Sequence, residues 1–199
     1  MGSGNAEPTE DVDQNRDCSI YLICVPTPID INNDPDLEPI EQLIRNIAPL
    51  VQKMDLIAVE STVFPGTCEQ VVLPLIERVS GLNYTTGFYL SHCSERINPG
   101  DLYWDSSNIP RVVGALTTTG PEVSAEFYAS ILGGRIYRVG DVRQSLSPKF
   151  SIENRELKLA HVGLGSVNIM RSIRDAESVK AMENTVRSVN IVFVNELSK

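Results

Sequence analysis

The sequence predicts an α/β fold, in which a mainly parallel sheet is followed by one long helix. Up to about residue 140, short apolar segments alternate with segments of helical periodicity. Parallel strands need helical crossovers of this kind between them. From 174 to 197 the chain has no Gly or Pro, and apolar residues recur every three or four positions, as in a helix. The 199 residues suffice for one sizeable core.

The composition argues against several classes of function. With 42% hydrophobic and 22% charged residues and no long apolar run, the chain is expected to be globular, with no membrane span. The net charge of -9 argues against nucleic acid as a partner, because phosphates require clustered Lys and Arg. The four cysteines show no CxxC spacing and no signal peptide precedes them, which indicates reduced thiols in the cytoplasm. With only two histidines, we expect no metal site.

The first elements follow from local patterns. Residues 1–17 are polar, acidic and aperiodic, and we expect a disordered lead-in. From Cys18, the run SIYLICVPTP predicts a buried strand that two prolines terminate. Apolar residues at helical spacing predict a helix over 40–51, and LIAVEST predicts a second strand over 56–62.

Capping signals predict the next helices. Thr67 and Gln70 have the spacing of a capping box, which predicts a helix from Thr67 to about Arg78. Thr119 and Glu122, with an early proline between them, predict another. Further strands are predicted over 87–93, 111–116 and 133–139, and the long helix over 174–199.

Four motifs carry polar residues. They are VPTP at 25–28, ESTVFPGT at 60–67, CSERINPG at 93–100 and AESVKAMEN at 176–184. The first three follow successive predicted strands. Because the carboxyl ends of parallel strands lie at one edge of a sheet, where ligands bind, we expect these loops to converge on one crevice.

The residue types in these motifs suit proton and oxyanion chemistry. Thr62 and Glu95 can position a water or accept a proton, whereas Lys180 and Asn184, one helical turn apart, can hold an alkoxide. Each has a simpler explanation when taken alone. Thr62 could serve a tight loop, Glu95 could form a solvated pair with Arg96, and the helical pair could simply be exposed. Their combination favours catalysis.

In this order, the motifs resemble the nucleotide-sugar (UDP-glucose/GDP-mannose/UDP-N-acetylmannosamine) dehydrogenases, which oxidise UDP-hexoses with NAD. ERINPG and ENTVRSVNI are most similar to the UDP-N-acetyl-D-mannosamine branch. The resemblance implies a Rossmann-like domain with an incomplete first half. Residues 18–143 would be its second half, because the glycine-rich turn that holds the NAD pyrophosphate does not precede Cys18.

The resemblance also implies roles. Such enzymes convert a C6 alcohol to a carboxylate by two hydride transfers, through an aldehyde and a cysteine thioester. Thr62 and Glu95 would act in hydrolysis, and Lys180 and Asn184 would stabilise the oxygen at C6. The implied NAD contacts are Pro26, Thr27, Ser61 and Thr62, and the implied UDP-sugar contacts are Glu95, Arg96, Asn98, Lys180 and Asn184. The long helix would form a homodimer contact.

Three features depart from the family. The catalytic cysteine belongs to a motif beyond the long helix, so none of the four cysteines is assigned as nucleophile. Ser94 stands where the family usually has proline. Residues 144–173 look inserted, and within them KLAHVGLGSVN at 158–168 is either an insertion loop or a displaced cofactor fingerprint, G-x-G-x-x-N.

The leading hypothesis is therefore an incomplete NAD-dependent UDP-sugar dehydrogenase. A non-catalytic module that keeps the fold and pairs through its long helix is the alternative. A β-hydroxyacid dehydrogenase shares the Lys-x-x-x-Asn spacing, but ESTVFPGT and SERINPG speak against it.

Overall fold

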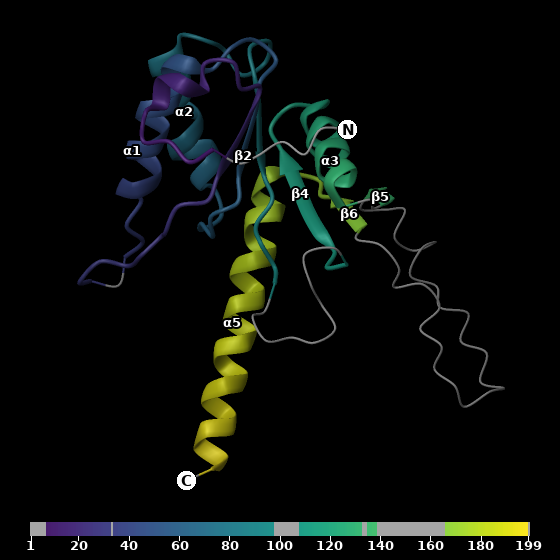
Figure 1. The fold of residues 1–199 in the computed structure, drawn as a ribbon. Helices are drawn as coiled ribbons and strands as arrows, with labels where there is room; N and C mark the ends of the chain where they lie inside the picture. The colour runs from purple at the N-terminus through teal and green to yellow at the C-terminus, as the bar shows by residue number, and fades with distance from the viewer. Residues whose placement is uncertain (1–6, 33, 98–107, 133–134, 139–165, 199) are drawn as a thin grey trace, which may run out of the picture.

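A computed structural model describes residues 7–32, 34–97, 108–132, 135–138 and 166–198, and it forms one mixed sheet with helices on both faces (Figure 1). The strands are β1 (Ile20–Ile23), β2 (Leu56–Val59), β3 (Tyr89–His92), β4 (Arg111–Ala115), β5 (Arg135–Arg138) and β6 (Ser166–Ile169). The helices are α1 (Glu38–Ile47), α2 (Leu73–Ser80), α3 (Gly120–Leu132) and α5 (Ile173–Leu197), with helical turns η1 (Val12–Asn15), η2 (Ala48–Leu50) and η3 (Cys68–Val72).

The strand order is β1-β2-β3-β4-β6-β5, and the predicted α/β class is confirmed. Strands β1, β2 and β3 are parallel, as are β4, β6 and β5, but β3 and β4 pair antiparallel. No helix is predicted between β3 and β4, and a parallel neighbour needs such a crossover. Because β4 runs antiparallel to β3, its first residue lies at the edge where β1, β2 and β3 end.

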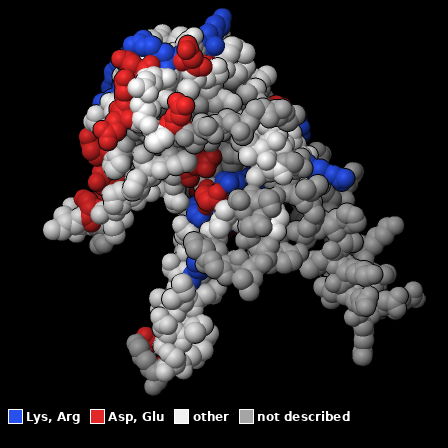
Figure 2. Space-filling model, viewed as in Figure 1, with Lys and Arg blue, Asp and Glu red and all other residues white. Residues whose placement is uncertain are grey.

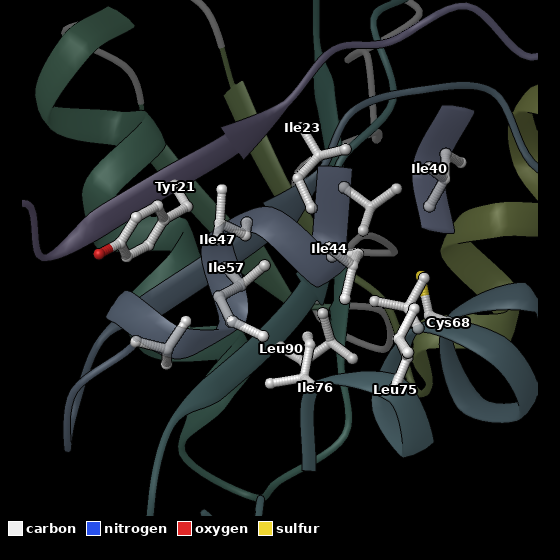
Figure 3. Close-up of a cluster of buried hydrophobic side chains, with 14 of the residues drawn as sticks. Tyr21, Ile23, Ile40, Ile44, Ile47, Ile57, Cys68, Leu75, Ile76 and Leu90 are labelled. Carbon is white, nitrogen blue, oxygen red and sulfur yellow. The ribbon is translucent and has the colours of Figure 1, made fainter. Parts of the chain in front are cut away.

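One face of the sheet packs against α1 and α2 (Figure 3). Ile40, Ile44 and Ile47 of α1 recur at helical spacing, and all three are buried. They pack in one cluster with Ile57 of β2 and Leu90 of β3. The helix predicted over 40–51 is thus confirmed, and its last turn becomes the 3-10 turn η2.

The opposite face packs against α3. Ala125 and Tyr128 of this helix cluster with Cys93 and Val113 from the sheet. Towards β1 this face is open, because Ile20 and Leu22 are 41% and 44% exposed. Helix α3 therefore covers only part of its side of the sheet.

Strand β6 is a feature that the sequence analysis missed. It lies between β4 and β5, although its residues belong to the stretch interpreted as an insertion, 144–173. The segment from 166 onwards is therefore part of the sheet and of the turn into α5. Asn168, the last position of G-x-G-x-x-N, lies in this strand and not at a helix N-terminus, so the structure does not support a cofactor fingerprint there. The two glycines, 163 and 165, lie outside the described residues.

The long helix is confirmed as α5. Ser172 is its N-cap, and its hydroxyl accepts a hydrogen bond from the Asp175 N–H at 3.0 Å. The helix begins directly over β4, where a Cβ on Gly114 would lie 2.3 Å from the Ser172 carbonyl oxygen. Glycine is required for this close approach. Among the described residues, no helix has both the length and the apolar character to cross a bilayer.

The lead-in also differs from its prediction. Within it, η1 is capped by the Asp11 carboxylate, which accepts from the Asp13 N–H at 3.1 Å. Val12 packs against the core cluster of the first face. This segment is therefore ordered from at least Asp11, and residues 1–6 lie outside the described part of the chain.

His92 in β3 is a buried polar residue within the sheet. It is fully buried, and neither ring nitrogen has a hydrogen-bond partner among the described residues. Burial lowers the pKa of His92 from 6.5 to about 4, because the imidazolium would lose its hydration. The folded protein therefore holds a neutral imidazole at this position above about pH 4.

We expect the free energy of unfolding to fall as the pH is lowered from about 6.5 to about 4. In this window the unfolded chain binds a proton at His92 that the folded chain does not, which costs about 3 kcal/mol at the lower limit. Urea unfolding of the chain and of His92→Leu across this range measures the difference. His161→Gln, at the other histidine, is the control and should retain the slope; an equal slope in His92→Leu would refute the prediction.

Candidate functional site

The loops after β1 and β2 are tied together at the carboxyl edge of the sheet. The Thr27 hydroxyl donates to the Thr62 carbonyl oxygen at 2.7 Å. The Ser61 hydroxyl donates to the Val25 carbonyl oxygen at 2.7 Å and accepts from the Val25 N–H at 2.9 Å. The predicted convergence of the first two motifs is thus present in the structure.

The residues of these two loops differ in their exposure to solvent. Pro26 is exposed, Thr27 and Thr62 are half-buried, and Ser61 is buried at 7% exposure. Because the Ser61 hydroxyl bonds to the backbone on the neighbouring loop, it fixes the loops and offers little surface to a ligand. Pro26, Thr27 and Thr62 remain as the accessible surface.

Glu95, after β3, has a fully engaged carboxylate. Its Oε1 accepts from the N–H groups of Arg96 and Ile97, at 2.6 and 2.9 Å. Its Oε2 accepts from Nη2 of Arg111 at 2.6 Å. The side chain is 42% exposed, so this anchored carboxylate still faces the crevice.

Arg111 is a site residue that sequence reasoning missed. Its guanidinium lies over the Tyr128 ring, 5.9 Å from the centroid, and its Nη1 is 3.9 Å from Oε2 of Glu60. The Tyr128 hydroxyl donates to the other Glu60 oxygen at 2.8 Å. Burial lowers the pKa of Arg111, but the neighbouring acidic groups, Cys93, Glu95 and Glu60, raise it above its ordinary value overall. The only sequence signal was an arginine at the start of the RVVGA strand.

The cysteines near this edge are poor nucleophiles. Burial raises the pKa of the Cys93 thiol to about 12, and burial together with Glu177 raises that of Cys68. Burial and Glu60 likewise raise the pKa of Cys24. Because the thiolate is the reactive form, these directions agree with assigning none of them as nucleophile.

Glu177 of α5 is a second residue that was missed. It is fully buried, and its carboxylate accepts from the Gly66 N–H at 2.5 Å and the Cys68 N–H at 2.8 Å. The predicted capping box is wrong, because the Thr67 hydroxyl donates instead to the Phe64 carbonyl oxygen at 2.8 Å. A carboxylate from a distant helix therefore caps the N-terminus of η3.

Lys180 lies on α5, one turn beyond Glu177, and is half-buried. Burial lowers the pKa of its amine, and so do Arg187 and Arg96, whereas Glu183 and Glu95 oppose the shift. The charge on Glu95 therefore acts on Lys180 across the space between the loop after β3 and α5. Asn184, one turn further on, is exposed.

Arg96 ties the loop after β3 to α5. Its Nε donates to Oε1 of Glu183 at 2.9 Å, Nη2 binds the same oxygen, and Nη1 donates to the Pro110 carbonyl oxygen at 2.9 Å. Figure 2 shows charged side chains of both signs where α5 meets the body of the molecule. Asn98 lies outside the described residues.

The structure thus bonds Arg96, the neighbour of Glu95, to Glu183 on the helix that carries Lys180, and Glu177 links the Thr62 loop to the same helix. Beside them, a groove of about 940 Å³ runs between α5 and Ile109–Pro110. A partly desolvated amine beside an anchored carboxylate can donate to a developing oxyanion and exchange protons with it.

The sequence of this chain is similar to a known family and to several known proteins. The model of the "UDP-glucose/GDP-mannose dehydrogenase family, NAD binding domain" matches residues 1–132. The UDP-N-acetyl-D-glucosamine 6-dehydrogenase of Salmonella typhi is 30% identical over 190 residues, which are 96% of this chain and 37% of that protein. The UDP-N-acetyl-D-mannosamine dehydrogenase of Pyrococcus horikoshii is 29% identical, over 100% of this chain and 39% of its own length.

Two solved structures match the fold of this chain. A UDP-D-ManNAc dehydrogenase from Pyrococcus horikoshii matches with a TM-score of 0.71 and 28% identity, over 94% of this chain and 37% of that one. A ternary complex of GDP-mannose dehydrogenase from Pseudomonas aeruginosa matches with a TM-score of 0.69 and 25% identity, over the same shares. The chain thus spans 37% to 39% of the length of these relatives.

We expect Glu177→Gln to lower the free energy of unfolding by about 1.5–3 kcal/mol, because it weakens two charge-assisted hydrogen bonds and turns an amide donor towards N–H groups. Urea unfolding measures the loss. Glu69→Gln, which removes an exposed pairing with Arg174, is the matched control and should cost less than about 1 kcal/mol. Equal losses of stability in the two variants would contradict the conclusion that Glu177 holds α5 to the loop after β2.

Proposed function

Since the chain belongs to the UDP-glucose/GDP-mannose dehydrogenase family, we propose that it forms the nicotinamide side of an active site that oxidises the C6 alcohol of a UDP-sugar with NAD. The observation that carries this proposal is the bond from Arg96, next to Glu95, to Glu183, which joins the loop after β3 to the helix that carries Lys180. Ligands bind at this edge in open α/β sheets.

The residues present suit the nicotinamide end of the cofactor. Pro26 offers an exposed apolar ring, and Thr27 and Thr62 lie half-buried beside it on loops that are hydrogen-bonded to each other. The described residues contain no glycine-rich turn at a helix N-terminus, so no pyrophosphate contact is assigned to them. NAD, when bound, accepts the hydride.

Each polar group then has a task. Lys180 donates a hydrogen bond to the oxygen at C6 as negative charge develops on it, and its half-buried position strengthens that interaction. Asn184 adds a neutral donor one turn along. Glu95 accepts a proton during hydrolysis, and the Thr62 hydroxyl positions a water for that step.

UDP-N-acetylmannosamine is the first candidate substrate and UDP-glucose the second. The relatives include proteins named UDP-N-acetyl-D-mannosamine dehydrogenase, and the ERINPG and ENTVRSVNI segments resemble that branch. Arg96, which is bound to Glu183 and the Pro110 carbonyl oxygen, presents a fixed cation on the substrate loop.

The outer half of α5 supports a homodimer. Met182, Val186, Val189, Phe193 and Leu197 are 57% to 71% exposed. A helix that exposes this much apolar surface is stable in water only when another surface covers it. A second copy, pairing along α5, is the proposed partner. A cytoplasmic location fits the four free cysteines.

A non-catalytic module is the second candidate. It is favoured by the exposed apolar residues of α5, which suit pairing with another protein. Such a module would keep the fold and the exposed α5 but would bind neither NAD nor a UDP-sugar.

Saturation-transfer NMR with NAD separates the candidates. We expect the nicotinamide protons to receive more saturation than the adenine protons, because the described loops form only that end of the site. Thr62→Val should weaken this transfer, and Lys53→Met, at an exposed position, should not. UDP-N-acetylmannosamine and UDP-glucose are tested in the same way, with NADH absorbance as a test of turnover. Absence of transfer to either class of ligand would refute the proposed function and favour the module.

A further inference from the structure

Arg111 is a buried cation with one short contact. The residue is 7% exposed, and its Nε and Nη1 have no hydrogen-bond partner among the described residues. Only Nη2 makes a short bond, to Oε2 of Glu95 at 2.6 Å. Glu60 is the other carboxylate nearby, at 3.9 Å from Nη1. The guanidinium is therefore directed at Glu95.

The sheet holds Arg111 in this position. In the antiparallel pair of β3 and β4, Ser91 lies opposite Ala115 and His92 opposite Gly114, and continuing this register brings Arg111 opposite Glu95. The Arg111 carbonyl oxygen accepts from Nδ2 of Asn168 in β6 at 3.1 Å. The backbone of Arg111 is thus fixed on both sides.

Tyr128 and Glu60 limit the guanidinium further. The Tyr128 ring lies 5.9 Å from the guanidinium carbon, and its hydroxyl holds Glu60 in place at 2.8 Å. If the Arg111 guanidinium rotated away from Glu95, it would be a buried cation without a short contact, which is unfavourable in free energy. The bond to Glu95 is therefore expected to persist.

From this geometry we propose that Arg111 is a positioning residue for Glu95, which holds one oxygen of its carboxylate in place at the edge of the sheet. The backbone N–H groups of Arg96 and Ile97 hold the second oxygen of the same carboxylate. The inference rests on the proposed roles of Glu95 and Lys180. Lysine cannot replace Arg111 fully, because an ammonium lacks the planar fork that reaches one carboxylate while remaining near another.

The test is amide hydrogen exchange of the folded chain at Arg96 and Ile97, whose N–H groups are bound to the Glu95 carboxylate. In Arg111→Met we expect both amides to exchange about tenfold faster or more, because the carboxylate that accepts from them is no longer held at its other oxygen. Arg111→Lys should give a smaller increase. Arg45→Met, which removes an exposed pairing with Glu41, is the control and should leave both rates unchanged.

Two further measurements keep the proposal falsifiable. If Arg111→Met does not fold, the double variant Arg111→Met/Glu60→Gln removes the second carboxylate charge and is measured instead. In the unaltered chain, a scalar coupling across the bond from Arg111 Nη2 to Glu95 is expected. Exchange rates at Arg96 and Ile97 within about twofold of the original in a folded variant, or a freely rotating guanidinium in the unaltered chain, would overturn the proposal.

These outcomes are independent of the proposed function, since the exchange measurement uses neither NAD nor a sugar. Faster exchange at Arg96 and Ile97 together with no ligand binding would refute the function and leave the positioning role intact. A purely structural role would lower the stability of the Arg111 variants and speed exchange throughout the chain, without a selective effect at these two amides.

Discussion

The site depends on the Glu177 carboxylate, which joins α5 to the loop after β2. It is fully buried, and it is compensated by the N–H groups of Gly66 and Cys68 at the N-terminus of η3. The partial positive charge of a helix N-terminus favours an anion there. An unpaired carboxylate at this depth would cost several kcal/mol, so its bonds restrict α5 to one position on the sheet. Lys180 follows one turn later, and its place beside Glu95 is a consequence.

The antiparallel junction is the second constraint. With β4 reversed, its first residue, Arg111, lies at the edge where β1, β2 and β3 end. A parallel β4 would have put this residue at the opposite edge. The carboxyl edge therefore has a buried cation, Arg111, bonded to the Glu95 carboxylate.

Local patterns were sufficient for most elements. The apolar runs predicted β1, β2 and β3, the helical spacing of Ile40 and Ile44 predicted α1, and the absence of Gly and Pro predicted α5 despite its β-branched residues. The convergence of the strand-end loops followed from the parallel order of the strands. These features depend on signals within about twenty residues of chain.

The features that the sequence did not predict depend on interactions between residues far apart in the chain. The Thr67 capping box failed because Glu177, from a distant part of the sequence, occupies the N-terminus instead. Strand β6 was missed because its four residues alternate too briefly to predict a strand without the neighbours that pair with them. Arg111 and Glu60 were assigned no role, although Glu60 begins the ESTVFPGT motif, since their contacts exist only once β3 and β4 are in register.

Amide hydrogen exchange at Gly66 and Cys68 tests most directly whether Glu177 holds α5 on the site. Both N–H groups are bound to a buried carboxylate, so they should exchange as slowly as the amides of β2. Exchange as fast as that of the exposed Phe64 amide nearby would show that the tether does not form, and the account of the site would then be contradicted.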